Sequence, residues 1–280
     1  MGDALVAWVG LSLCQGIGGV KLRRLLEHFG DAKTILGTSS DELQTVKGVT
    51  ESIAHNIHAI DLNQLATDIH RWQEQGIHIL TWDSTDYPQS FLKLPDAPPT
   101  IFALGNVDIW KKPTAYAIVG TRTPYPKKRT ETLLLSVEMA EKGHLVVSGL
   151  AEGIDAAAHL GTFTVVTGRT VAVLGSGILN VYPHHHKALS QAILERDGAI
   201  LCEVSPNSVV SDWGLVGRNR LIVALSQALI VMQTETDGGA MHAVKFAKRQ
   251  NKAIYADNNI ASGNRAILAD GGHDLATLML

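Results

Sequence analysis

From residue 115 onward, short uninterrupted apolar runs alternate with longer segments whose apolar residues recur at helical spacing. Apolar runs without polar alternation indicate strands buried on both faces, and the helix-length segments between them indicate crossover helices. The pattern therefore predicts an α/β fold: a Rossmann-like, doubly wound, mostly parallel sheet with helices on both faces. The expected strands are 115–119, 144–147, 170–174, 199–202, 228–232 and 253–255, and the expected helices are 127–142, 153–160, 186–197, 217–226 and 239–250.

The first sixty residues follow another pattern, in which glycine turns open short helices. Gly16-Ile17-Gly18-Gly19-Val20 precedes one apolar stripe at helical spacing, and Lys47-Gly48-Val49 precedes a second. Such turns resemble helix-hairpin-helix or sterile-alpha-motif (HhH/SAM-like) modules, which can offer backbone N–H groups to DNA phosphates. A bundle used only for packing or association would show the same pattern. We predict a small all-helical domain over residues 1–62 and an extended Rossmann-like domain over residues 63–280, with further strands at 77–80 and 101–104.

Composition narrows the class of protein. The chain is 45% hydrophobic and 18% charged, which is ordinary for a globular domain. Its two cysteines, Cys14 and Cys202, are too few for a disulfide framework or a zinc site. The sequence shows no apolar run of membrane-spanning length and no secretory signal, so we expect a cytoplasmic protein without membrane contact. Residues 1–110 carry 7 basic and 13 acidic groups and residues 111–280 carry 17 and 14, so a polyanion site is expected in the second part.

Two small-residue turns follow expected strands and open helices. Gly120-Thr121-Arg122 ends the strand 115–119, and Ser148-Gly149 begins a turn that reaches Gly153. Parallel strands end at one edge of a sheet, where backbone N–H groups, helix N-termini and an arginine fork suit phosphate. The first turn also lies in a stretch without acidic residues, between Ile109 and Thr130. The basic residues of this stretch are Lys111, Lys112, Arg122, Lys127, Lys128 and Arg129.

Two later segments add candidate contacts. On a helix, Arg218 and Arg220 point about 200° apart, so one can face a ligand while the other braces the fold; Asn219 lies between them. Trp213 and Leu215 could stack on a base, with core packing as an equally weighted alternative. Gly238 and Gly239 open the last basic helix and again suit an anion.

Other motifs give weak signals. Gly175-Ser176-Gly177 follows a strand, but Asn180 stands where the dinucleotide fingerprint needs a third glycine. The adjacent histidines 184–186 cannot easily converge on one ion, so we expect no metal. We find no nucleophilic triad or paired carboxylates, and we expect neither a cofactor nor an enzyme.

Several strings together resemble the DNA-processing protein A family (DprA, also called Smf). They are Gly120-Thr121-Arg122, the run from Ser148 to Asp155 followed by Ala158-His159, Tyr182-Pro183, and Arg218-Asn219-Arg220. The resemblance covers nearly the whole chain. Departures from the family's usual pattern occur at Pro126, Val216-Gly217, Gln233, Asp237, Gly239 and Asp257-Asn258.

The resemblance implies a sequence-independent single-stranded DNA-binding protein. Such a protein protects incoming strands and loads RecA recombinase during natural transformation, as a homodimer built largely through the Rossmann-like domain. It also implies that the DNA-binding residues are the ones already marked: Gly120, Thr121, Arg122, Ser148, Gly149, Gly153, Trp213, Leu215, Arg218, Asn219, Arg220, Gly238 and Gly239.

Two other functions remain open from the sequence. A nucleotide-binding or nucleotide-hydrolysing Rossmann protein would use similar turns, although such hydrolases place a glutamate soon after the glycines, where this chain has Ala240-Met241-His242. An assembly role that has lost DNA binding would keep the fold and the dimer.

Overall fold

The computed structural model describes residues 2–111 and 114–280, and the chain divides into two compact units, Met1–Ile101 and Phe102–Leu280. The predicted boundary at residue 62 coincides with the start of a helix inside the first unit, and as a domain boundary it stays a prediction. None of the helices among the described residues is both long and apolar enough to cross a membrane.

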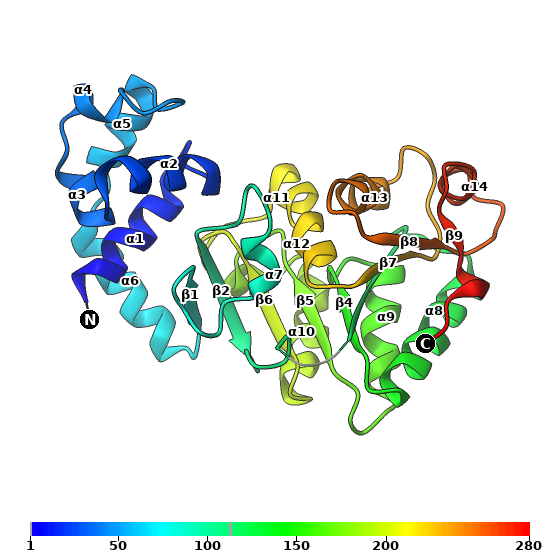
Figure 1. Ribbon diagram of the computed structural model, residues 1–280. Helices are drawn as coiled ribbons and strands as arrows, with labels where there is room; N and C mark the ends of the chain where they lie inside the picture. Colours follow the sequence, from blue (N-terminus) through cyan, green and yellow to red (C-terminus); the bar gives the residue numbers. More distant parts are fainter. Residues whose placement is uncertain (1, 112–113) are drawn as a thin grey trace. The chain divides into compact units, whose positions relative to one another are not determined.

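The first unit is mainly helical (Figure 1). Its buried core contains Leu11, Leu22, Leu25, Ile35 and Ile57, which supply the apolar faces that the sequence pattern predicts. Its elements are α1 (Asp3–Leu13), α2 (Gly19–Phe29), α3 (Ala32–Gly37), α4 (Ser40–Leu43), α5 (Glu51–His58), α6 (Leu62–Glu74), β1 (His78–Thr81) and α7 (Gln89–Leu92).

Side-chain caps explain where several of these helices begin. Asp31, Thr50 and Asp61 each accept hydrogen bonds from backbone N–H groups in the first turn of α3, α5 and α6. Ser39 and Glu42 form a reciprocal capping box on α4. Because the first amides of a helix have no intrahelical partner, these short polar residues set the helix starts.

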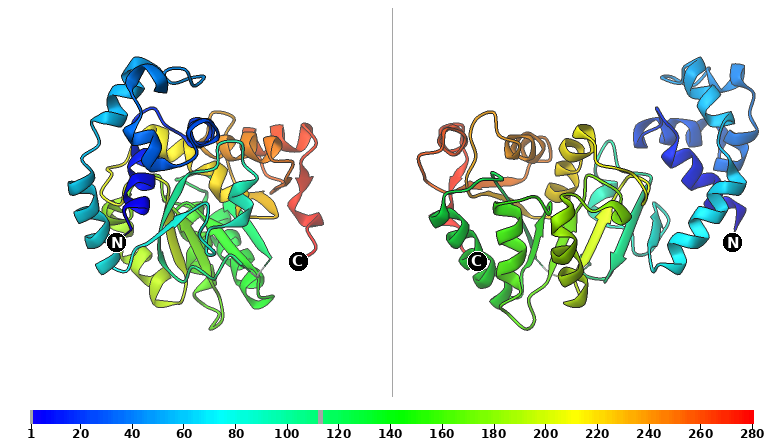
Figure 2. Two further views of the ribbon diagram at one scale, coloured as in Figure 1. Left: turned by 60° about the vertical axis from the view of Figure 1, so that its left-hand side comes forward. Right: turned by 180° about the vertical axis from the view of Figure 1, so that it is seen from behind.

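The second unit is a twisted sheet with helices on both faces (Figures 1 and 2). Helices α8, α9 and α10 cover one face, and α12 and α13 cover the other, as right-handed crossovers require. Its elements are β2 (Thr100–Gly105), β3 (Ala115–Val119), α8 (Pro126–Glu141), β4 (Leu145–Ser148), α9 (Ile154–Thr162), β5 (Thr170–Val173), α10 (Lys187–Glu195), β6 (Ala199–Cys202), α11 (Asp212–Gly217), α12 (Asn219–Ala224), β7 (Ala228–Val231), α13 (Ala240–Arg249), β8 (Ala253–Ala256), α14 (Ser262–Ala269), β9 (His273–Asp274) and three short 3₁₀ turns.

Within this unit the strand order is β2-β6-β5-β4-β3-β7-β8-β9. Strand β2 runs antiparallel to β6, with Phe102 opposite Cys202, whereas the pairs from β6 to β9 are parallel. The predicted fold class is confirmed. The chain winds outward from β3 in one direction to β6 and then returns to add β7 on the other side, so β3 marks the point where the strand order reverses.

Two local predictions differ from the structure. The helix expected over 217–226 is the shorter α12, and the unpredicted α11 precedes it, with Arg218 between the two. The elements α14 and β9 follow the last predicted strand and have no counterpart among the predicted elements.

Candidate functional site

An open cavity of about 570 Å³ lies at the carboxyl edge of the parallel strands. It sits beside β3, where the strand order reverses and where doubly wound folds place their ligands. Three stretches surround it: the turn after β3, the α11–α12 junction, and the loop from β7 into α13. Its lining residues are Val119, Gly120, Thr121, Arg122, Ala151, Asp155, Asp212, Leu215, Val216, Arg218, Asn219, Glu235, Asp237, Gly238, Gly239, Ala240 and His242.

Arg122 is the exposed cation of this cavity. Its side chain makes no hydrogen bond or ion pair with any residue that the structure describes. The backbone just before it is nevertheless held in place, because Thr121 donates its N–H to the carbonyl of Gln233 at 2.7 Å and its carbonyl accepts from the N–H of Ile154 at 3.2 Å. A mobile guanidinium with five free donors on a rigid turn can meet an anion bidentately.

Arg218 lies behind Arg122 and is buried, with 6% of its surface exposed. Its Nη1 donates to the carbonyl of Val173 at 2.9 Å and to the carbonyl of Gly149, and its Nη2 lies 3.7 Å from Asp155 Oδ2. Burial lowers the pKa of the Arg218 guanidinium; Asp155 opposes that shift and the positive charge of Arg122 adds to it. Two arginines that disfavour each other's charge make the space between them favourable for an anion.

Asp155 holds the turn between β4 and α9, as the sequence suggested. Its Oδ2 accepts from the N–H of Ala151 at 3.3 Å. Burial raises the pKa of this carboxyl, and the Arg218 guanidinium opposes the rise. The pair therefore braces the floor of the cavity, where each charge compensates the other.

The glycines of this turn make room for that packing. A Cβ on Gly149 would lie 2.5 Å from Arg218 Cζ and 2.7 Å from Asp155 Oδ2. Gly153 has a φ of +74°, and a Cβ there would collide with the backbone of Thr121 and Arg122. Only glycine fits a positive φ with such a close approach.

Five of the predicted contact residues do not line the cavity. Ser148 is buried and donates its hydroxyl to the carbonyl of Ile118 at 2.6 Å, so its hydroxyl is already used. Arg220 is buried against Glu203. Trp213 is 69% exposed on α11, next to lining residues, rather than packed in the core. Gly149 and Gly153 lie beneath the floor.

The two helix N-termini that the sequence assigned to phosphate differ. At α9, the N–H of Ile154 is bonded to Thr121 and the N–H of Ala156 to Ala151, and Ile154, the first residue of this helix, does not line the cavity. At α13, the N–H groups of Met241 and His242 are bonded to the carbonyls of Gly238 and Gly239, but Gly238, Gly239 and Ala240 line the cavity. The positive end of the α13 dipole therefore points at the space that Arg122 borders.

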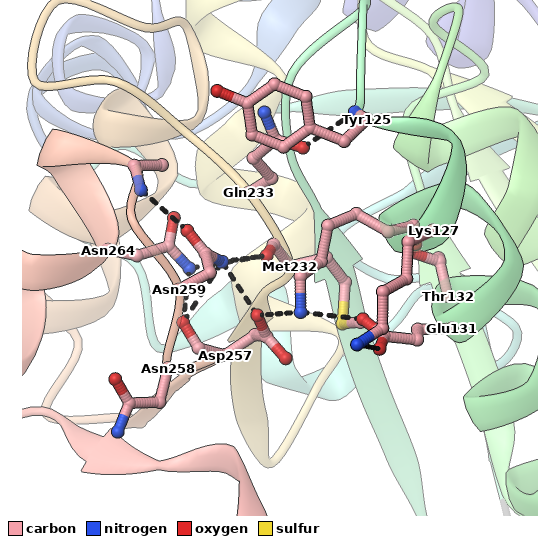
Figure 3. Close-up of polar contacts among 12 residues, drawn as sticks. Tyr125, Lys127, Glu131, Thr132, Met232, Gln233, Asp257, Asn258, Asn259 and Asn264 are labelled. Carbon is pink, nitrogen blue, oxygen red and sulfur yellow. Dashed lines mark hydrogen bonds and ion pairs between the residues drawn. The ribbon is translucent and has the colours of Figure 1, made fainter.

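The side chain of Gln233 fixes the other end of the Arg122 turn, which the sequence did not reveal. Its Oε1 accepts from the N–H of Tyr125 at 2.9 Å (Figure 3), while its carbonyl accepts from Thr121. Gln233, which follows β7, thus holds the Arg122 turn at both ends.

The basic stretch around Arg122 is only partly free. Lys128 Nζ lies 2.6 Å from both Glu131 and Asp257, two acids that Figure 3 shows close together. Lys127 Nζ is 3.7 Å from Glu131, and Lys112 lies outside the described residues. The stretch therefore contributes less cationic surface than its sequence indicates.

Acidic residues share the cavity wall. Asp212, Glu235 and Asp237 line it on the side of α11 and α13. Ser262 donates its hydroxyl and its N–H to Glu235, and these bonds lower the pKa of that carboxyl. No group of three or more His, Cys, Asp or Glu side chains among residues 2–111 and 114–280 is arranged to hold a metal ion.

A family model described as DNA recombination-mediator protein A matches residues 78–276, well over half of the chain. The chain belongs to this family. Protein Smf from Synechocystis is 32% identical over 254 residues, covering 89% of this chain and 63% of that protein. DNA processing protein DprA from Bacillus subtilis is 31% identical over 185 residues, covering 66% and 62%. The matches thus span less than two thirds of either relative.

Two solved structures of family members share the fold. The X-ray structure of DprA from Streptococcus pneumoniae superimposes with a TM-score of 0.81 over 97% of each chain, at 22% identity. DprA from Helicobacter pylori gives a TM-score of 0.62 at 27% identity, over 70% of this chain and 90% of that one. The H. pylori structure concerns the single-stranded DNA binding mode of that protein.

Proposed function

We propose that this protein binds single-stranded DNA without sequence preference, protects incoming strands and loads RecA recombinase in natural transformation. The observation that carries the proposal is Arg122, an exposed arginine without a partner among the described residues, held by a rigid turn over a cavity at the strand-order reversal. Its family supports a role in DNA recombination, and the single-strand binding described for the H. pylori relative supports the choice of ligand.

In the proposed complex, one phosphate lies between Arg122 and the first turn of α13, with Arg218 behind it. Contacts of this kind read the backbone and carry no sequence information. The side chains of Leu215 and Trp213 stand at the same rim and offer apolar faces to unpaired bases. Stacking is open to any base but needs an unpaired strand, so phosphate binding combined with stacking favours single strands over duplexes.

The role is one of binding, without catalysis. The glycines before α13 are followed by Ala240, Met241 and His242, and no glutamate stands there. We further propose a homodimer built largely through the Rossmann-like unit, with RecA as the protein partner; family membership supports both proposals.

The test is fluorescence anisotropy with a labelled single-stranded oligonucleotide and the matched duplex, at 50 and 200 mM salt. With about three phosphates contacted, single-strand affinity should fall on the order of tenfold to a hundredfold across that range. Arg122→Ala should weaken single-strand binding by at least about tenfold, because a charge-assisted bidentate contact is lost. Arg122→Lys should recover only part, since an ammonium cannot reproduce the fork.

Arg196→Ala is the matched control. Arg196 follows α10 at the opposite edge of the sheet, where its guanidinium lies 4.6 Å from the Phe163 ring centre. The control removes the same charge and should leave binding unchanged. Affinity that is flat with salt, or equal loss in both variants, would contradict a phosphate site at the cavity.

A nucleotide ligand is the second candidate, because a cavity of about 570 Å³ is within the range of small-molecule sites. Thermal unfolding with nucleoside mono- and diphosphates separates the two functions. A strand-binding protein should gain little stability from mononucleotides at 1 mM, whereas a nucleotide-binding protein should gain several degrees in Tm.

A further inference from the structure

The two glycine turns of the first unit pack against each other's helices. A Cβ on Gly16, in the turn before α2, would lie 2.8 Å from Ile53 of α5. A Cβ on Gly48, in the turn before α5, would lie 3.6 Å from both Lys21 and Arg24 of α2. Gly16 and Gly48 also share a φ near +90°, so the arrangement is reciprocal.

Three cations converge at the second turn: Lys21, Arg24 and Lys47, here called the Gly48 cluster. Lys21 Nζ donates to the carbonyl of Gly16 at 2.8 Å, and Arg24 Nη1 donates to the carbonyl of Lys47 at 3.1 Å. These bonds fix the direction of two side chains but use only one donor of each. The remaining donors are available to a ligand.

No carboxylate among the described residues forms an ion pair with the Gly48 cluster. Two other cations of the first unit do have acidic partners: Lys33 pairs with Asp3 at 3.2 Å, and Arg71 with Asp68 at 2.5 Å. This unit carries more acidic than basic residues, yet the three cations at this turn have no acidic partner among the described residues. Their mutual repulsion would be relieved by an external anion.

The cluster borders a second open cavity of about 380 Å³, lined by Arg24, Glu27, His28, Thr45, Val46 and Lys47. Glu27 is the one carboxylate in this lining. Two acids near Gly48 in the sequence do not line this cavity: Glu42 is engaged by Ser39 in the capping box, and Glu51 is the first residue of α5. Positive charge therefore exceeds negative charge at the cavity rim.

We propose that the Gly48 cluster is a second nucleic-acid contact that binds the phosphodiester backbone. The ligand follows from the chemistry: rigidly directed ammonium and guanidinium donors beside an open, shallow cavity suit a flexible chain of phosphates. The contact lies wholly in the first unit and does not depend on Arg122 or on the cavity beside β3. It would extend the footprint of the protein along one strand or onto an adjoining duplex.

The experiment uses the full chain in four forms: unchanged, Arg122→Ala, the triple variant Lys21→Gln/Arg24→Gln/Lys47→Gln, and both sets combined. Anisotropy is measured against salt with a single-stranded oligonucleotide and with a duplex. The triple variant should lower the slope of log affinity against log salt by about 2 on single strands, as expected for about three lost contacts. In the Arg122→Ala background it should remove the binding that remains. A larger change on the duplex would assign the contact to duplex DNA, which also supports a phosphodiester site.

Lys33→Gln/Arg71→Gln is the matched control, because it removes two cations of the same unit that already have acidic partners. For this control, the slope of log affinity against log salt should equal that of the unchanged chain. If the triple variant unfolds, Lys47→Glu replaces it: the Lys47 side chain is exposed and forms no hydrogen bond or ion pair with the residues that the structure describes, and charge reversal there should lower affinity by at least about threefold.

The outcomes separate this proposal from the proposed function. A slope that the triple variant leaves unchanged in both backgrounds overturns the second contact, whatever Arg122→Ala does. Loss in the triple variant with no effect of Arg122→Ala supports the second contact and rejects the cavity beside β3. Equal binding of poly-glutamate would also overturn the proposal, because the cluster would then attract any polyanion.

Discussion

Arg122 and Arg218 border the same cavity, and their surroundings are opposite. Arg122 is exposed and has no partner among the described residues, whereas Arg218 is buried and bound to Gly149, Val173 and Asp155. The first keeps its donors for a ligand. The second has its Nη1 bonded to two backbone carbonyls and its Nη2 paired with Asp155, while its Nε is buried without a hydrogen-bond partner among the described residues. We therefore expect separable roles for these two identical side chains, one in binding and one in holding the floor of the cavity in shape.

The comparison predicts that the buried arginine matters for stability and the exposed one for binding. Arg218→Met should lower the free energy of unfolding by about 3–5 kcal/mol, because it leaves Asp155 as a buried carboxylate without its counter-charge. Arg122→Met should change stability by less than about 0.5 kcal/mol. Urea unfolding followed by circular dichroism measures both.

The double variant Arg218→Met/Asp155→Leu sharpens this test. Removing both charges should recover most of the loss, since the cost in the single variant comes from the uncompensated carboxylate. A single variant as stable as the unchanged chain would mean that Arg218 does not brace the cavity floor.

His159, like Arg218, is buried, and it makes the stability of the protein depend on pH. Its Nδ1 is 2.7 Å from Thr170 Oγ1, whose hydroxyl donates to the carbonyl of Val146, so Nδ1 carries the proton. The other ring nitrogen, Nε2, is buried without a partner among the described residues. Burial, together with the charges of Arg218 and His186, lowers the pKa of His159 to about 3.

Because the unfolded chain binds this proton near pH 6.5 and the folded chain only near pH 3, stability falls as the pH drops between those values. The slope is about 1.4 kcal/mol per pH unit for one proton. His159→Asn keeps a donor for Thr170 and cannot titrate, so its stability should fall less steeply than that of the unchanged chain between pH 6 and 4.5. His78→Asn, at an exposed histidine, should keep the full slope.

The periodicity of the sequence predicted the sheet because its strands are apolar on both faces. The eight predicted strands correspond to β1 to β8, to within a residue or two. The helix α11 was not predicted, because its six residues are too few to show a helical period, whereas α12 lies within the predicted helix 217–226. The short β9 has no periodic signal, and it forms by pairing with β8.

At the site, the sequence predicted where the turns lie, but not which of their polar side chains are bonded within the protein and which remain free. Ser148 and Arg220 are typical ligand-binding residue types, yet one is bonded to Ile118 and the other to Glu203 across gaps of thirty and seventeen residues. Gln233 stood out only as a departure from the family's usual pattern, and its structural role was not predicted, since that role depends on meeting Tyr125 from 108 residues away. Long-range pairing decides which donors remain free, and a single sequence does not contain it.

Gln233 provides a test of how far the exposed arginine depends on its support. Gln233→Met keeps the side-chain length and removes the acceptor for Tyr125, which should cost about 1 kcal/mol of stability. Single-strand affinity should fall about threefold, because the Arg122 turn is then held at one end only. In the Arg122→Ala background the same substitution should leave affinity unchanged. An equal loss in both backgrounds would show that Gln233 acts elsewhere.

Asp237 gives the smallest expected effect and the most direct test of charge at the open rim. It is exposed, lines the cavity and lies just before α13, where a negative charge competes with phosphate for the helix dipole. Asp237→Asn should strengthen single-strand binding about two- to threefold at 50 mM salt, and the gain should shrink at 200 mM as screening increases. Glu141→Gln makes the same change in net charge at the far end of α8 and should have no effect. If both variants strengthened binding equally, the total charge of the protein would govern affinity. The position of Asp237 beside the cavity would then have no special effect on binding.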